Sequence, residues 1–179
     1  MELLSLAASS SSSLPMPEVP QLPQQIPTYI PELLLSFYGE LVYLNRLSSL
    51  QNCAVVNQDT IGAFQQLFDH MSQGVGPETY MSDGMQIGLS LTRAVSTCSG
   101  ATLSELHALN SWFARVAGSK QAMVDTATPN VHKHAQEIQE HVMEVWATFF
   151  KFDAPKKTGV AIAKTAYWAL GPVDQNAIL

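Results

Sequence analysis

Residues 128–153 have the sequence TPNVHKHAQEIQEHVMEVWATFFKFD, the most regular stretch of this 179-residue chain. Thr128 can cap the first free amides of a helix, and Pro129 suits the first helical position. Pro155 ends the helix, because a proline pushes the residue before it out of helical geometry. The stretch therefore predicts one long amphipathic helix with a buried seam. The seam residues recur at alternating steps of four and three: Val131, Ala135, Ile138, Val142, Val145, Phe149 and Phe152.

The remaining chain also has helical patterns. Residues 31–50 are apolar on more than one face, which predicts a helix that Pro31 opens and that is buried on several sides. Thr102 and Glu105 form the pattern of a capping box, and residues 119–127 read as a loop. We predict an all-α fold, a single helical-bundle domain of about five to six helices. It spans residues 31–171, after an arm at 1–30 and before a C-terminal tail at 172–179.

The arm is rich in serine and proline. Six prolines lie between residues 15 and 31, which disfavours helix and central strand and favours an extended path. Apolar residues alternate with these prolines, so we interpret the segment as an assembly arm that lies on a neighbouring subunit; a solvated tail is the alternative. The arm residues that would make this contact are Leu14, Met16, Val19, Leu22 and Ile26.

Charge is scarce, at 13% of residues against 46% hydrophobic residues. This favours a protein that hides surface against copies of itself or a partner, although a neutral polar surface is the alternative. The net charge of −6 leaves only a local basic surface to attract nucleic acid. Lysines interleaved with aromatic residues near the C-terminus offer one, with solvated lysines as the simpler interpretation. The candidate RNA contacts are Arg93, Arg115, Lys151, Lys156, Lys157 and Lys164.

A possible metal face occupies the long helix. His134, Glu137, His141 and Glu144 lie three and four residues apart, as the ligands of a helical metal site do. No second helix offers a matching Glu-x-x-His pair, so we interpret these residues as an ordinary paired helix face. Motifs for a nucleophile elbow, a phosphate loop or a dinucleotide site are lacking, and the sequence predicts no cofactor and no enzyme.

Cys53 and Cys98 lack the spacing of metal or redox motifs, which predicts two free thiols in a reducing compartment, with a disulfide as the alternative. No apolar run reaches the length of a membrane span, and the first residues lack the basic start of a signal peptide. We expect a cytoplasmic or virion protein without a membrane partner.

Size, few charges, a Ser/Pro-rich arm and an apolar tail give the chain an outline that resembles small helical coat proteins of rod-shaped or filamentous RNA viruses. The resemblance implies self-assembly and packaging of single-stranded RNA. Our leading hypothesis is a non-enzymatic, coat-like structural protein. The alternative is a cytosolic helical adaptor that binds a partner through the apolar 31–50 helix. A third hypothesis is a helical enzyme or metal protein that uses the His134 face.

Overall fold

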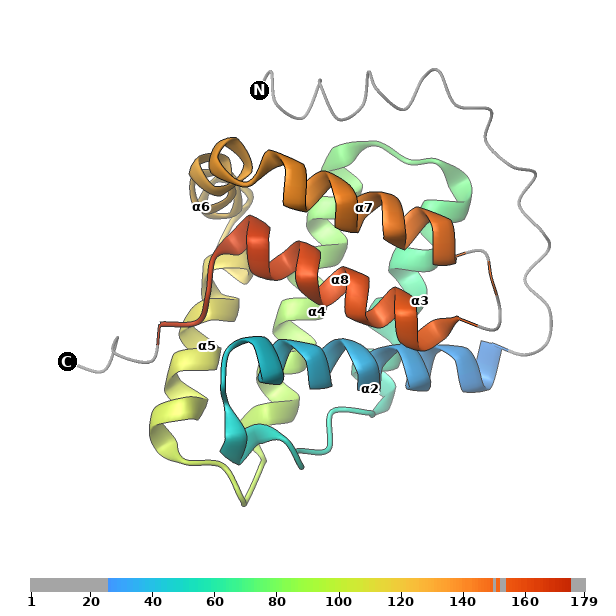
Figure 1. Ribbon diagram of the computed structural model, residues 1–179. Coiled ribbons are helices and arrows are strands. Elements are labelled where there is room, and N and C mark those ends of the chain that lie inside the picture. Colours follow the sequence, from blue (N-terminus) through green and yellow to red (C-terminus); the bar gives the residue numbers. More distant parts are fainter. Residues whose placement is uncertain (1–25, 150, 152–153, 175–179) are drawn as a thin grey trace.

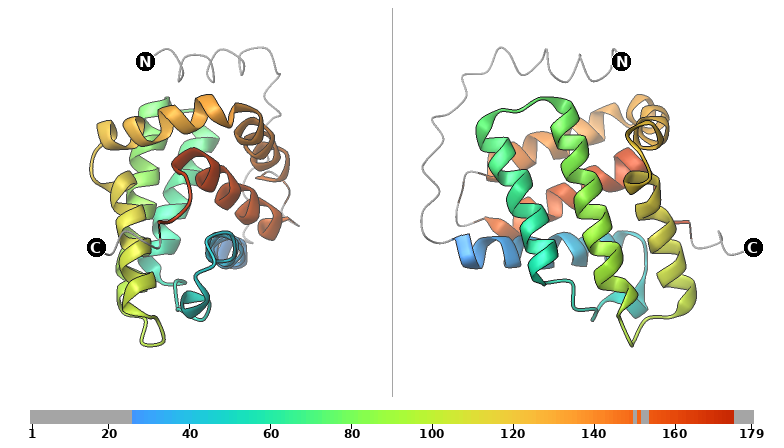
Figure 2. Two further views of the ribbon diagram at one scale, coloured as in Figure 1. Left: turned by 60° about the vertical axis from the view of Figure 1, so that its left-hand side comes forward. Right: turned by 180° about the vertical axis from the view of Figure 1, so that it is seen from behind.

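The computed structural model describes residues 26–149, 151 and 154–174, and in this part of the chain it confirms the all-α fold, with seven α-helices and no strand. One layer consists of three neighbouring helices: α3 (Gln58–Gln73), α4 (Pro77–Ser96) and α5 (Leu103–Ala117). A second layer runs across the first (Figure 1) and contains α2 (Ile26–Leu44), α8 (Pro155–Leu170) and α7 (Ala135–Phe149). Two further elements complete the fold: the 3-10 helix η2 (Ser48–Leu50) after α2, and α6 (Lys120–Lys133) between α5 and α7 (Figure 2).

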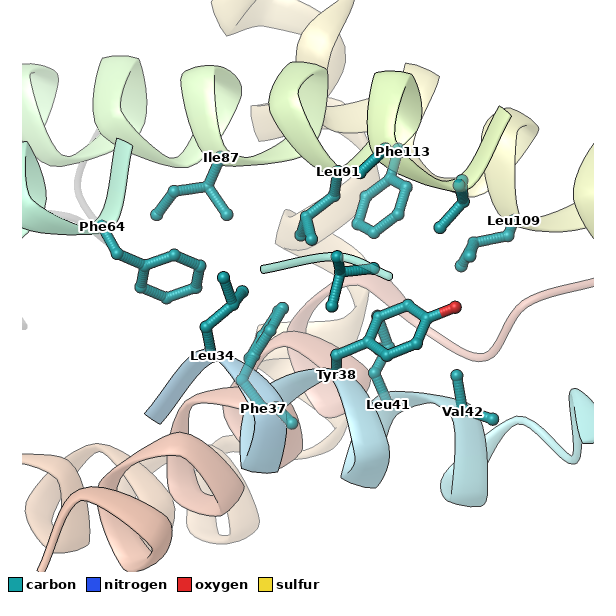
Figure 3. Close-up of a cluster of buried hydrophobic side chains, with 14 of the residues drawn as sticks. Leu34, Phe37, Tyr38, Leu41, Val42, Phe64, Ile87, Leu91, Leu109 and Phe113 are labelled. Carbon is teal, nitrogen blue, oxygen red and sulfur yellow. The ribbon is translucent and has the colours of Figure 1, made fainter. Parts of the chain in front are cut away.

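The core lies between the two layers, and α2 is its central element. Side chains of α2 such as Phe37, Tyr38 and Leu41 face Phe64 of α3 and Leu91 of α4 (Figure 3). None of these five side chains is more than 4% exposed. Burial on several sides is therefore confirmed for α2, and the surface that it covers is the domain's own core. The helix ends at Leu44, however, and not near residue 50 as predicted.

The prediction that Pro31 opens this helix is wrong, because α2 begins at Ile26 and Pro31 lies inside it. An internal proline removes one backbone hydrogen bond, here to the carbonyl of Pro27. Tertiary contacts offset that loss: the Tyr29 hydroxyl donates to the Phe149 carbonyl at 3.2 Å, and Ile30 is buried. Residues 1–25 of the predicted arm lie outside the described part of the chain.

The predicted single helix over 128–153 is in fact two. Residues 119–127, expected as a loop, begin α6, where the Ser119 hydroxyl accepts a hydrogen bond from the Ala122 amide at 3.0 Å. Thr128 is not a cap, since its hydroxyl donates to the Val124 carbonyl at 2.7 Å within α6, and Pro129 lies inside the same helix. The chain bends at His134 before α7 begins.

Contacts with α8 accompany this bend. The side-chain amide of Asn130 donates to the Ala169 carbonyl at 3.2 Å, and the His134 ring lies 4.7 Å from the Trp168 ring. The described residues of the predicted seam therefore lie on two helices, α6 and α7, and not on one. Phe149 is buried, whereas Ile138 and Val142 are only half-buried, so the prediction of a fully buried seam is wrong for the first half of α7.

The segment predicted as a C-terminal tail, residues 172–179, begins with contacts to the core. The Val173 amide donates to the buried Asn45 side chain at 2.7 Å, and the Trp112 indole donates to the Gly171 carbonyl at 2.7 Å. Val173 is itself buried, so the start of the segment predicted as a tail belongs to the core. The end of that segment, residues 175–179, lies outside the described residues.

A disulfide joins Cys53 to Cys98 with their Cα atoms 5.3 Å apart, so the prediction of two free thiols is wrong. Cys53 precedes α3 and Cys98 follows α4, and these two helices form an antiparallel pair (Figure 2). The ends of such a pair meet on one side of the molecule, which is why cysteines far apart in sequence become neighbours.

Glu105 adds a second link nearby. Thr102 caps α5 as predicted, accepting from the Glu105 amide at 3.4 Å. The Glu105 carboxylate, however, does not reach back to Thr102 as a capping box requires; it accepts from the amide of Ser49, at 2.9 Å, and from the Ser49 hydroxyl. The Thr102 half of the predicted capping box is therefore present, whereas the Glu105 carboxylate instead joins α5 to η2.

Candidate assembly and ligand surfaces

Three of the predicted basic residues gather around the turn between α7 and α8. Lys151 follows α7, and Lys156 and Lys157 lie in the first turn of α8. All three are exposed, and none makes an ion pair with another described residue. We call these three residues the lysine cluster. Lys164 lies about two turns further along α8 and is half-buried.

The aromatic residues near the lysine cluster have other partners. Phe149 is buried and stacks on Phe68, with ring centroids 4.4 Å apart and an interplanar angle of 10°. Tyr167 and Trp168 pack edge to face at 5.4 Å. Phe150 and Phe152 fall outside the described residues. Phe149 is therefore a core residue, and it is not available to stack on a base.

The structure does not bring the two arginines to the lysine cluster. Arg93 is exposed in the last turn of α4, and Arg115 is half-buried in the last turn of α5. Neighbouring α4 and α5 run antiparallel (Figure 2), so their last turns lie at opposite ends of that layer. The six predicted bases consequently do not form one continuous basic surface.

The His134 face resolves into two separate pairs. The Nδ1 atom of His134 lies 3.9 Å from Glu137, and that of His141 lies 3.6 Å from Glu144. Among the residues that the structure describes, no three His, Cys, Asp or Glu side chains are grouped as metal ligands would be. The arrangement is that of i,i+3 pairs on a helix surface.

His70 has a partner that sequence reasoning missed. Its Nδ1 atom lies 2.8 Å and 3.0 Å from the two carboxylate oxygens of Asp83, which is 1% exposed. Asp69, the acid next to His70 in sequence, is exposed instead. The signal was in α4: Asp83 shares the i,i+4 row of Ile87 and Leu91, and an acid at an apolar position requires a partner from another helix.

Among the described pairs of a basic and an acidic side chain, His70 and Asp83 contain the most deeply buried carboxylate. Burial, and to a lesser extent the negative charge of Asp83, raises the pKa of the neighbouring Tyr80. The geometry fixes the orientation of His70 and joins α3 to α4.

None of the helices that the structure describes combines the length and the apolar character needed to cross a bilayer. Comparison of the chain with protein-family models, with curated proteins and with solved structures gives no significant match.

Proposed function

We propose that this protein is a non-enzymatic structural protein that assembles with copies of itself in a coat-like particle. One observation carries the proposal: α6 contains no buried residue, and in α7 only Thr148 and Phe149 are buried. Most apolar side chains of this helix pair are only half-buried in their own domain, and a second copy that covers them completes their burial.

The surface chemistry supports this proposal. Met143 has 49% of its surface exposed, and the seam residues Ile138 and Val142 of the same helix are half-buried. The low content of charged residues, 13%, also favours contact with another protein surface. The adaptor alternative rests on Leu35 and Tyr43, which the 31–50 segment leaves exposed, whereas most other large apolar side chains of that segment pack in the domain's own core.

The disulfide bears on where such a particle would exist. Disulfides persist in oxidising surroundings, including the surfaces of virions, and are rare in the cytosol. The Cys53–Cys98 bond thus favours a virion location over the cytoplasmic one in this proposal.

RNA packaging is the second candidate function. The lysine cluster, which is exposed and makes no ion pair with another described residue, favours it, whereas the net charge of −6 opposes general attraction to nucleic acid. Absorbance at 260 and 280 nm, before and after ribonuclease treatment of native particles, tests it. RNA that copurifies in a fixed ratio to protein would support packaging.

The test of assembly is light scattering coupled to size-exclusion chromatography of the full chain, at concentrations from about 1 to 100 μM. We expect oligomers that grow with concentration, because an interface binds by mass action. A clean monomer throughout this range would contradict the proposal.

The arm supplies a second test. Removal of residues 1–25, just ahead of α2, should leave the helical signal in circular dichroism unchanged while the particles become smaller. The assembly contact of the arm stays a prediction, because Leu14, Met16, Val19 and Leu22 lie outside the described part of the chain, whereas Ile26 is the first residue of α2. If the shortened chain forms the same particles, the arm has no part in assembly.

A further inference from the structure

Charge is segregated between two neighbouring helices. Glu137, Glu140 and Glu144 lie on α7, which has no lysine or arginine, whereas α8 has lysines and no acid. The side chains of Glu137 and Glu144 are 45% and 46% exposed, and Glu140 is exposed as well. We call the three glutamates the acidic face of α7. One chain thus presents two patches of opposite sign.

These patches do not neutralise each other within one copy. Among the described residues, Glu137 and Glu144 form ion pairs with histidines of α7 alone, and Glu140 accepts a hydrogen bond from Gln136 at 3.2 Å. No ion pair among the described residues joins the acidic face to the lysine cluster. Glu140 lies nine residues before the end of α7, about 13 Å along the helix axis, whereas the lysine cluster lies beyond that end.

An apolar side chain lies within the acidic face. Met143 falls between Glu140 and Glu144 in sequence, on the side of α7 that faces away from the core. An unbranched and polarizable methionine adapts to varied partner surfaces. The acidic face therefore offers both charge and an apolar contact, which a docking surface for protein needs.

We propose that the acidic face of α7 in one copy binds the lysine cluster of a second copy. The inference rests on the proposed self-assembly and names its contact. The two patches differ, so the contact is heterologous, and every copy keeps one free patch of each sign. Repetition of such a contact builds a ring or an open chain. Opposite charges set the register and the rate of this contact, while Met143 and its surroundings contribute apolar burial.

A charge-swap series tests the contact. The first variant carries Lys156→Glu and Lys157→Glu, and the second carries Glu140→Lys and Glu144→Lys. Each alone should raise the concentration needed for assembly at least tenfold, because like charges then meet at the contact. The variant with all four changes should assemble again, and so should an equimolar mixture of the first two variants.

A matched control carries Arg93→Glu, Gln65→Glu and Gln66→Glu, three exposed positions on α3 and α4 outside α6, α7 and the lysine cluster, with the same change in net charge as the first variant. It should assemble like the unchanged chain. Circular dichroism of every variant verifies folding. Assembly of the unchanged chain should also weaken between about 0.05 and 1 M salt, because salt screens exposed charges.

The outcomes separate the two proposals. If the unchanged chain assembles but the swaps have no effect, the contact lies elsewhere and the inference fails while the proposed function stands. If the unchanged chain is monomeric, the proposed function fails and the inference fails with it. Loss of copurifying RNA from the first variant, with assembly unchanged, would assign the lysine cluster to nucleic acid instead.

Discussion

Gly159 of α8 lies so close to Leu33 of α2 that a β-carbon on the glycine would overlap the Leu33 carbonyl oxygen. The same carbon would overlap the Ser36 hydroxyl and lie 2.9 Å from the Phe37 amide nitrogen. Backbone atoms cannot move aside as the end of a flexible side chain can. The two helices are therefore in contact through their backbones, and Ala163, one turn further along α8, is fully buried.

This contact predicts that Gly159→Ala destabilises the fold by about 3 kcal/mol, at the upper end of the cost of overpacking a core. Gly39→Ala is the matched control on α2, since a β-carbon there has no other atom within 4 Å. The control should be neutral or stabilising by up to about 1 kcal/mol, because alanine favours helix. Urea unfolding measures both, and equal stabilities would contradict the close approach.

The buried pair of His70 and Asp83 predicts a large and non-additive effect. His70→Ala leaves the Asp83 carboxylate buried without its partner, which should cost about 3–5 kcal/mol. The double variant with Asp83→Leu should regain part of that loss, because no unpaired charge then remains. Urea unfolding of both single variants and the double variant measures the coupling. Additive costs would show that the pair does not act as a unit.

The disulfide predicts sensitivity to reducing agents. Its loop spans a sequence separation of 45 residues, for which chain entropy gives about 4 kcal/mol of stabilisation at 25 °C. Cys53→Ser with Cys98→Ser should therefore lower the melting temperature by about 8–16 °C. A thiol reductant should do the same to the unchanged chain and nothing further to the variant. Two free thiols in the unreduced, denatured chain would contradict the bond.

Tyr38 predicts a loss of stability in alkali. Burial, and then the negative charge of Glu105, raise the pKa of its phenol, and its hydroxyl donates to the Leu50 carbonyl at 2.8 Å. The unfolded chain loses this proton near pH 10, so stability is intact below about pH 10 and falls as the pH rises further. We expect this alkaline loss to be smaller in Tyr38→Phe.

Urea unfolding at about pH 8 and pH 11 measures the effect. Tyr38→Phe should be less stable by about 1 kcal/mol at the lower pH, because the Leu50 carbonyl loses its donor, and the difference should shrink at the higher one. Tyr43→Phe is the control, because Tyr43 is 73% exposed. An alkaline loss of the same size in the Tyr38 variant and in the unchanged chain would contradict the assignment.

The helical class and several helix starts were predictable because they depend on neighbours in sequence. A Thr at 102 caps the amide three residues later whatever the rest of the chain does, and the apolar spacing of residues 31–50 requires a helix buried on several sides. The lysine cluster was also visible, since its members are close in sequence.

Partners distant in sequence were decided by the tertiary structure alone. The helical spacing of apolar residues continues through His134 in the sequence. In the structure, contacts of Asn130 and His134 with α8 accompany a bend that divides the predicted helix. The same holds for Asp83, whose apolar position showed that it needed a partner but not that the partner is His70. Local patterns fix which residues share a helix face, whereas the residue that each face meets depends on how the helices pack. That packing is a free energy summed over contacts between segments, and no single segment contains it.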